Sequence, residues 1–258
     1  MLKVAVFGAG GRMGRAICAA VHSDPELDLV AAVDPAIAGE AAEGVVVAST
    51  PEAIGRAGAE VAIDFTVSSA ALSNASWCAE NAVHAVIGTT GLHEEAFEQL
   101  AKMFSQGTAN CIIAPNFAIG AVLMMRFAEM AAPWFETVEI IELHHDGKLD
   151  APSGTATLTA QRLSTARRAR PGGSPARGGG QAPAARGSET APGVRVHSVR
   201  LRGLVAHQEV LLGTTGQILT IRHDSLDRSS FMPGVLLATK EVPHRAGFTV
   251  GIEALLGL

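Results

Sequence analysis

The sequence has few cysteines, and their spacing argues against two classes of protein. Its 258 residues include three, Cys18, Cys78 and Cys111, far apart along the chain. No Cys-x-x-Cys or cysteine–histidine pair has the spacing of metal ligands, so we expect neither a disulfide framework nor a metal site. Each cysteine lies in an apolar or alanine-rich run, which favours a small buried thiol. Such thiols suit a reducing compartment, and we expect the protein to be cytoplasmic.

The sequence also lacks a strong charge and a long hydrophobic run. Its formal net charge is −5, which gives no reason to expect a nucleic-acid partner. The longest apolar stretch, 111–128, is interrupted by Pro115, Asn116 and Arg126, whereas a membrane span needs about 20 mostly apolar residues. The chain starts on a strand-like segment with no charged-then-apolar leader. We therefore expect neither a membrane segment nor a signal peptide.

The first part of the chain alternates short apolar runs with helical stretches, the pattern of a doubly wound parallel sheet of α/β class. Several of the runs are apolar throughout, as strands buried on both faces should be. The expected strands are Lys3–Phe7, Asp28–Val33, Val61–Phe65, His84–Gly88 and Asn110–Ala114. The expected helices between them are Met13–His22, Ser69–Asn81 and Glu94–Phe104.

Beyond residue 117 the pattern changes to a smaller α+β domain. Three strand-like segments follow one another without a helix between them, which predicts an antiparallel or mixed sheet. The expected elements are a helix over Ile119–Ala132, a strand over Thr137–Leu143, a helix after Pro152, strands over Val194–Arg202, Glu209–Gly213 and Gln217–His223, and a helix over Phe231–Val242. We expect a first domain over 1–117, completed by residues from about 226 to 258, and a second domain over 118–225.

Residues 166–193 differ in composition from both domains. They are rich in Arg, Ala, Gly and Pro, and such a segment cannot bury enough apolar area to offset its ordering entropy. The sequence therefore predicts a disordered surface loop here.

A glycine-rich loop, Gly8–Gly14, follows the first strand directly and opens a helix. Glycine lets the backbone turn tightly and approach a pyrophosphate, while the helix N-terminus offers N–H groups to the phosphates. The third glycine comes one residue later than in the usual G-x-G-x-x-G spacing, because Met13 occupies its place. Asp34 ends the second strand about 20 residues further on, where an acidic residue binds the adenosine ribose. The alternative for Asp34 is a turn residue before Pro35.

Three more loops are expected at the same edge of the sheet, where open α/β sheets bind ligands. They are 64–66, 88–91 and 114–117. We expect them to meet the nicotinamide half of a dinucleotide.

The segment from Glu139 to Ala156 is the densest in chemically active side chains. A strand runs into a loop that contains His144, His145 and Lys148, which can transfer protons near neutral pH. Pro152–Thr155 looks like a helix start, whose N–H groups and hydroxyls can bind a carboxylate. Taken singly, the histidines could be solvated and Ser-Gly-Thr a simple cap. Asp150 is better interpreted as an orienting or capping residue than as a catalytic one.

This segment resembles the signature of the 4-hydroxy-tetrahydrodipicolinate reductase (dihydrodipicolinate reductase) family, E-I/V-x-E-x-H-x3-K-x-D-x-P-S-G-T-A, and matches every fixed position. The resemblance covers nearly the whole chain. Residues 8–15 look like the family's nucleotide loop and 88–91 like its nicotinamide loop. In addition, 114–117 look like the loop beside its hinge, while 203–204 and 222–225 resemble its C-terminal half. Gly147 departs from the pattern, since many members carry another histidine there.

The resemblance implies a Rossmann domain joined to a mixed-sheet domain that builds a homotetramer. The implied reaction is hydride transfer from NADH or NADPH to a cyclic unsaturated dicarboxylate, giving tetrahydrodipicolinate on the route to diaminopimelate and lysine. It implies His144 and Lys148 as catalytic residues and His145, Ser153, Gly154 and Thr155 as substrate-binding residues. The expected cofactor-binding residues are Gly8, Ala9, Gly10, Gly11, Arg12, Met13, Asp34, Gly88, Thr89, Thr90, Ala114, Pro115, Asn116 and Phe117.

Two other functions fit parts of the sequence. One is another two-domain dehydrogenase, which the Glu139–Ala156 segment argues against. The other is a catalytically silent regulator that senses a dinucleotide. That alternative predicts loss of the lysine or histidines, yet His144, His145 and Lys148 are all present.

Overall fold

The structure is a computed structural model that describes residues 1–89, 91–105, 107–169 and 186–258. The chain divides into two units, which are described separately. Unit 1 comprises Met1–Phe117 and Phe231–Leu258, and unit 2 comprises Ala118–Ser230.

Unit 1 contains an eight-stranded sheet in the order β13-β7-β6-β5-β1-β2-β4-β3. All neighbours are parallel except the short β3–β4 pair. The strands are β1 (Leu2–Phe7), β2 (Leu27–Val33), β3 (Ala41–Ala42), β4 (Val45–Ala48), β5 (Val61–Asp64), β6 (His84–Ile87), β7 (Cys111–Ile113) and β13 (Phe248–Val250). The chain builds outward from β1 through β2 and β4, then crosses to the other side of β1 with β5. The switch point between β1 and β5 is where such sheets bind dinucleotides.

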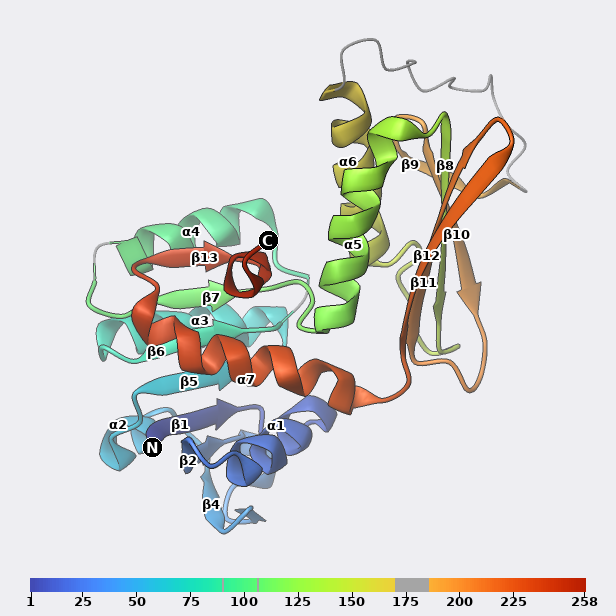
Figure 1. Cartoon of the computed structure of the whole chain (residues 1–258). Coiled ribbons are helices and arrows are strands. Elements are labelled where there is room, and N and C mark those ends of the chain that lie inside the picture. Colours follow the sequence, from blue (N-terminus) through green and yellow to red (C-terminus); the bar gives the residue numbers. More distant parts are fainter. Residues whose placement is uncertain (90, 106, 170–185) are drawn as a thin grey trace. The chain divides into compact units, whose positions relative to one another are not determined.

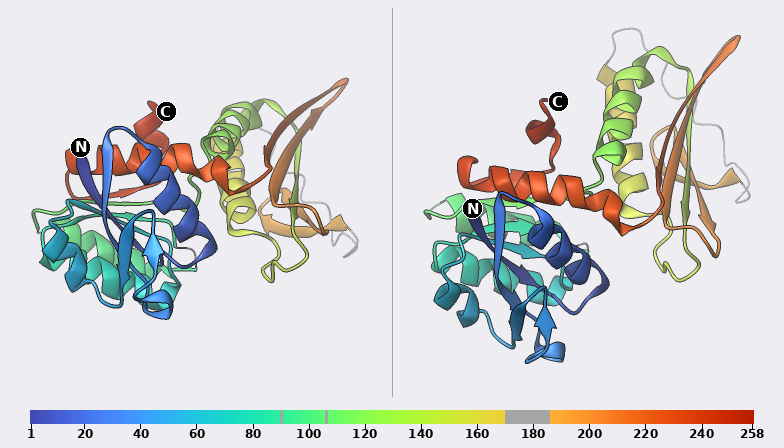
Figure 2. Two further views of the ribbon diagram at one scale, coloured as in Figure 1. Left: turned by 90° about the horizontal axis from the view of Figure 1, so that it is seen from below. Right: turned by 60° about the horizontal axis from the view of Figure 1, so that its bottom comes forward.

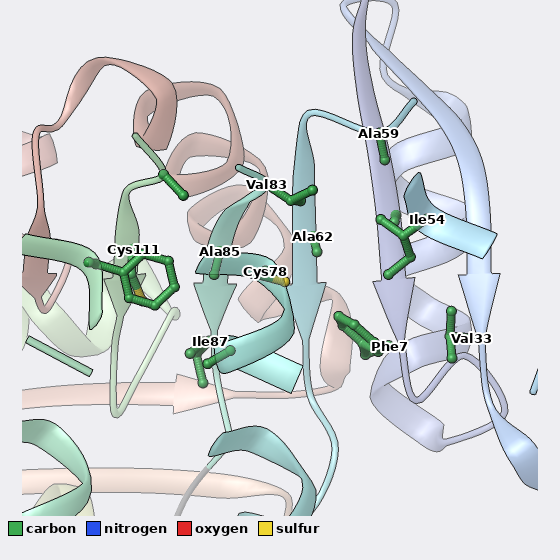
Figure 3. Close-up of a cluster of buried hydrophobic side chains, with 14 of the residues drawn as sticks. Phe7, Val33, Ile54, Ala59, Ala62, Cys78, Val83, Ala85, Ile87 and Cys111 are labelled. Atoms are coloured by element: carbon green, nitrogen blue, oxygen red, sulfur yellow. The ribbon is translucent and has the colours of Figure 1, made fainter. Parts of the chain in front are cut away.

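Helices cover both faces of this sheet (Figure 1), as the apolar strands require. The helices are α1 (Arg12–Ser23), α2 (Glu52–Ala57), α3 (Ser68–Glu80), α4 (Glu94–Ser105) and α7 (Met232–Glu241). One buried cluster packs α2, α3 and α4 on one face, through residues such as Ile54, Cys78 and Phe104. Figure 3 shows Ile54 and Cys78 in this cluster. Helices α1 and α7 lie side by side on the other face (Figure 2). This confirms the expected doubly wound sheet.

The C-terminal segment completes unit 1. Lys240 of α7 forms ion pairs with Asp24, at 2.9 Å, and with Glu26, in the turn after α1. The Asn110 amide donates to the carbonyls of Val242 and Pro243, at 3.0 and 3.2 Å. Strand β13 then adds to β7 at the sheet edge. The short β3, β4, α2 and β13 were not expected from the sequence, because each has at most six residues and no clear periodicity.

Unit 2 contains a five-stranded mixed sheet in the order β12-β11-β8-β10-β9, as expected. Its strands are β8 (Thr137–His144), β9 (Ser188–Ala191), β10 (Val194–Arg200), β11 (Ala206–Thr214) and β12 (Gln217–Ser225). Only β8 and β10 are parallel; the other pairs are antiparallel. Helices α5 (Ile119–Ala131) and α6 (Gly154–Ala169) lie side by side on one face (Figures 1 and 2).

The expected disordered loop over 166–193 is wrong at both ends. Helix α6 continues to Ala169, and β9 occupies Ser188–Ala191. The prediction treats the arginines of this segment as solvated, but Arg167 is buried. Its guanidinium donates to the carbonyls of Gly193, at 3.0 Å, and Glu136, which ties the end of α6 to its neighbours. Residues 170–185 lie outside the described residues.

Neither a metal cluster nor a membrane helix is found in the described ranges. No three His, Cys, Asp or Glu side chains there gather as metal ligands would. No helix in those ranges is long and apolar enough to cross a bilayer.

Candidate active site and nucleotide site

The glycine loop of unit 1 is shaped by contacts that leave no room for a side chain. Gly8 has a φ of +71°, which favours glycine, and the Gly11 N–H donates to the Gly8 carbonyl at 3.0 Å. A Cβ on Gly14 would lie 1.9 Å from the Gly8 oxygen. Gly14 thus serves as the third glycine despite its shifted spacing, because it lets α1 approach the end of β1 closely. The N-terminus of α1 is therefore presented as phosphate-binding loops require.

The other residues expected in this loop lie around the start of α1. Ala9 is buried, Gly10 and Met13 are half-buried, and Gly11 and Arg12 are exposed.

Asp34 lies next to this loop and contacts it directly. Its Oδ2 accepts the Gly10 N–H at 2.9 Å, and its Oδ1 accepts the Ala36 N–H at 3.0 Å. Both interpretations of Asp34 therefore have support. It caps the turn that begins at Pro35, and it also lies against the nucleotide loop.

A cavity of about 420 Å³ opens at the switch point of the sheet. Gly8, Gly11 and Asp34 line it, together with the loop after β5. The complete lining is Phe7, Gly8, Gly11, Val33, Asp34, Pro35, Ser49, Pro51, Phe65, Thr66, Val67, Ala70 and Asn74. The loop after β5 thus shares a cavity with the expected ribose residue. A dinucleotide fits this arrangement, because the glycines leave the backbone uncovered and an acidic side chain stands at the end of β2.

The three further loops expected at this edge come together around the Phe65 ring. A Cβ on Gly88 would lie 2.1 Å from that ring, so Gly88 is needed for the close approach. Phe117 packs against the ring, with 5.5 Å between the centroids. Thr89 is buried, and its hydroxyl donates to Asp64, the last residue of β5, at 3.1 Å. Ala114 is buried, Asn116 half-buried and Pro115 exposed, whereas Thr90 lies outside the described residues.

In unit 2 the candidate chemistry lies where β8 ends and α6 begins. His144 is the last residue of β8, and a turn follows in which the Lys148 N–H donates to the His145 carbonyl at 3.1 Å. Ser153 is buried, and its Oγ accepts the Ala156 N–H at 3.2 Å, which caps α6. Gly154 and Thr155 form the first turn of α6, the part of a helix that attracts anions.

A fully buried carboxylate holds His144 in place. Glu142 has no exposed area, and its Oε2 lies 2.5 Å from His144 Nδ1. Arg200 of β10 binds both oxygens of Glu142, at 2.8 and 3.0 Å. Burial acts to raise the pKa of Glu142. Hydrogen bonds from His144, Arg200 and Ser198 lower this pKa by more than burial raises it, so that it falls from 4.5 to about 2. Since Glu142 is then ionised and can only accept, His144 Nδ1 donates to it, and Nε2 is the ring nitrogen that this contact leaves for a ligand.

The same network extends to Lys148. Arg200 donates to the Asp150 carbonyl at 2.7 Å, and the Asp150 carboxylate pairs with the Lys148 ammonium at 2.7 Å. Burial raises the pKa of Asp150, but the Lys148 hydrogen bond and charge lower it below its ordinary value. Asp150 thus orients Lys148, as its sequence position suggested. Glu142, Arg200 and Asp150 together link the two expected proton donors, His144 and Lys148.

Arg200 could not be found from the sequence. Arg200 is 58 residues from Glu142 and sits in an ordinary strand pattern, so only the parallel pairing of β10 with β8 reveals it. Glu142 does carry a signal in the sequence, since it is an acidic residue in a strand, on the same face as the buried Val138 and Ile140. Gly14 was visible too, as the glycine one position late.

Fold and site together define a two-domain NAD(P)H-dependent oxidoreductase. Unit 1 carries a dinucleotide-binding fold, and unit 2 brings a histidine and a lysine, held by carboxylates, beside a helix N-terminus.

Comparison with known proteins identifies the particular family. Residues 2–117 match the family model described as "Dihydrodipicolinate reductase, N-terminus", and residues 120–256 match "Dihydrodipicolinate reductase, C-terminus". The chain belongs to the dihydrodipicolinate reductase family.

Relatives and a solved structure agree with this assignment. The chain is 50% identical over 260 residues to the 4-hydroxy-tetrahydrodipicolinate reductase of Cutibacterium acnes, covering 100% of both chains. It is 50% identical to that of Nocardia farcinica, covering 100% of this chain and 99% of the relative. The dipicolinate-bound dihydrodipicolinate reductase from Paenisporosarcina sp. TG-14 superposes with a TM-score of 0.84 at 40% identity, over 98% of this chain and 99% of that one.

Proposed function

We propose that this enzyme reduces 4-hydroxy-tetrahydrodipicolinate to tetrahydrodipicolinate with NADH or NADPH. The observation that carries the proposal is the network from His144 through Glu142, Arg200 and Asp150 to Lys148, beside the N-terminus of α6. A cyclic dicarboxylate has the two features that this arrangement serves. Its carboxylates need cationic and N–H partners, and its reduced ring needs a proton.

The dinucleotide, when bound, supplies the hydride. The loop Gly8–Met13 would bind its pyrophosphate and Asp34 its ribose. Gly88, Thr89 and Thr90, with Ala114, Pro115, Asn116 and Phe117, would complete the cofactor site.

Unit 2 would hold the substrate and manage its proton. Loss of the 4-hydroxyl group as water would give an unsaturated imine. Hydride addition to that imine leaves an electron-rich product that must gain a proton, and a positioned acid typically speeds such a step by about 10²–10⁴-fold. Lys148, held by Asp150, and His144, held by Glu142, would be the donors. His145, Gly154 and Thr155 would bind the substrate carboxylates. Ser153 would act with them mainly by capping α6, because its Oγ already accepts the Ala156 N–H.

The experiment is a steady-state assay of NADH oxidation by the purified enzyme. Oxidation should require the condensation product of pyruvate and aspartate semialdehyde, and either precursor alone should give none. A silent dinucleotide-sensing regulator would bind NADH without oxidising it under any of these conditions. Oxidation of NADH with another carbonyl substrate, but not with the condensation product, would instead favour a different dehydrogenase.

We also propose that the enzyme works as a cytoplasmic homotetramer. The three cysteines are free and buried, which fits a reducing compartment. The sheet face of unit 2 opposite α5 and α6 carries apolar side chains that are not fully buried, namely Ile141, Leu143, Val199, Leu211 and Ile218. Association would bury this face. Light scattering at micromolar concentration should report four chains, and a monomer would contradict the assembly.

A further inference from the structure

Asp64, the last residue of β5, is a buried carboxylate that the chemistry above does not use. It is only 3% exposed. Its Oδ1 accepts the Thr66 N–H at 2.8 Å, the Thr66 hydroxyl at 2.6 Å and the Thr89 hydroxyl at 3.1 Å. Its Oδ2 accepts the Asn74 amide at 2.7 Å. All of these donors are uncharged. The carboxylate accepts their hydrogen bonds and thereby fixes the orientation of their side chains.

Asp64 determines where its neighbours direct their polar hydrogens. A threonine hydroxyl has one proton and two lone pairs. Thr66 has a second acceptor, the Val67 carbonyl, but at 3.5 Å this is far longer than its contact with Asp64. Because Asp64 takes the hydroxyl protons of Thr66 and Thr89, both hydroxyls can offer a ligand only lone pairs. Asn74 likewise turns its NH₂ group to Asp64, which leaves its Oδ1 at the other end of the amide.

Thr66 and Asn74 line the cavity at the switch point, and its other walls are largely apolar, with Val33, Pro35 and Pro51 among them. The cavity therefore combines apolar walls with hydrogen-bond acceptors on one side. Such a site suits a flat base that donates from its edge. The 6-amino group of adenine is a donor, whereas the 6-oxo group of hypoxanthine would face acceptors.

We propose that Asp64 is a positioning residue which makes this cavity selective for a 6-aminopurine base. This inference rests on the dinucleotide site proposed above, and it adds which base the site selects and why. Asp64 would act only through Thr66, Asn74 and Thr89, whose polarity it fixes.

The test compares two reduced dinucleotides, NADH and its hypoxanthine analogue, by fluorescence titration without substrate. The wild-type enzyme should bind NADH roughly tenfold more tightly or better, because the 6-oxo group of the analogue would leave an acceptor of the cavity unpaired. Asp64→Asn should shrink this ratio. An amide in that place must donate at one end, so that Asn74 or Thr66, both of which line the cavity, must turn and present a donor to it.

Two further variants keep the test decisive if Asp64→Asn does not fold. Thr66→Val keeps the side-chain shape but removes one acceptor, so it should also lower the ratio. Thr239→Val is the matched control, since Thr239 is a fully buried threonine of unit 1 whose hydroxyl donates to the Val235 carbonyl within α7. Thr239→Val should leave the ratio of the two dinucleotide affinities unchanged, because it removes a buried hydroxyl that does not contact the cavity.

Equal wild-type affinities for the two dinucleotides would overturn the selectivity while leaving the proposed function intact. A wild-type preference for NADH that survives both Asp64→Asn and Thr66→Val would overturn the role of Asp64. Failure of the wild-type enzyme to bind either dinucleotide would overturn the proposed function together with this inference.

Discussion

The nucleotide site of unit 1 and the proton-donor site of unit 2 are built in different ways. Apart from the carboxylates of Asp34 and Asp64, the first is shaped by backbone and uncharged groups: Gly14 lies against the Gly8 carbonyl, and the donors to Asp64 are all neutral. The second is held by charges, with Glu142 bound to Arg200 and Lys148 to Asp150. A site made of backbone geometry should be sensitive to added volume. A site made of buried charges should be sensitive to loss of charge and to pH.

The largest expected effect is on turnover, from removing a proton donor. His144→Ala and Lys148→Ala should each lower kcat by roughly 10²–10⁴-fold, because the reduced substrate then lacks a positioned acid. Steady-state kinetics measures this. Near-wild-type kcat in both variants would reduce the loop to a binding surface.

Neighbouring variants serve as the comparison for this effect. His145→Ala and Thr155→Ala should act mainly on KM, because these residues would contact substrate carboxylates rather than transfer protons. A fall in kcat as steep as that of Lys148→Ala would assign them to the chemistry instead.

Glu142→Gln should be the most destabilising of the conservative changes. It leaves Arg200 facing a neutral amide in a buried place, and breaking such a pair costs about 3–5 kcal/mol. Urea unfolding measures the loss, and Asp146→Asn is a suitable control because its ion pair with Arg202 is exposed. Equal stability of the two variants would contradict the role given to Glu142.

The same variant gives a pH signature. The pKa of Glu142 is lowered in the folded enzyme, from 4.5 to about 2. Its contribution to stability is therefore complete above pH 4.5 and disappears as the pH falls toward 2. The difference in unfolding free energy between wild type and Glu142→Gln should shrink over this window. A difference that stays constant down to the acid limit would contradict the assignment.

On the nucleotide side, Gly14→Ala should weaken NADH binding by roughly 10–100-fold, since forced overpacking costs about 1–3 kcal/mol. The added Cβ would lie 1.9 Å from the Gly8 oxygen, so the loop must move. Gly55→Ala in α2 is the matched control, because its Cβ would meet only the Trp77 ring, at 3.8 Å. Fluorescence titration measures the NADH affinity of both variants. Equal affinities would show that the loop tolerates a side chain.

Asp34→Ala should shift cofactor preference by about tenfold toward NADPH. A 2′-phosphate beside Asp34 would meet like-charge repulsion of up to about 4 kcal/mol at 4 Å, which the exposed Arg12 partly offsets. The wild-type enzyme should therefore use NADH at least as well as NADPH. The ratio of kcat/KM values is the readout, because loss of the Asp34–Gly10 hydrogen bond weakens both cofactors alike. A strong wild-type preference for NADPH would contradict the ribose assignment.

The sequence predicted most of the fold, and it offered candidate residues for both sites because each set lies largely in one contiguous segment. The nucleotide loop is contiguous, so strand, glycines and helix start can all be seen within residues 2–14. The loop around His144 and Lys148 is also contiguous and chemically distinctive. Arg200 and the hub at Asp64 depend on strand pairing and loop convergence across long sequence separations, which local patterns do not contain. The boundary error at 166–193 has the same origin, because the backbone carbonyls that hold the buried Arg167 lie 31 and 26 residues away along the chain.

We assign dinucleotide binding to unit 1 and proton donation to unit 2. The double variant His144→Ala/Lys148→Ala tests this assignment most directly. Its NADH dissociation constant and its single-turnover rate with the condensation product are measured on the same preparation. We predict an NADH affinity within about twofold of wild type and almost no NADH oxidation. Oxidation at the wild-type rate, or loss of NADH binding together with turnover, would contradict the account.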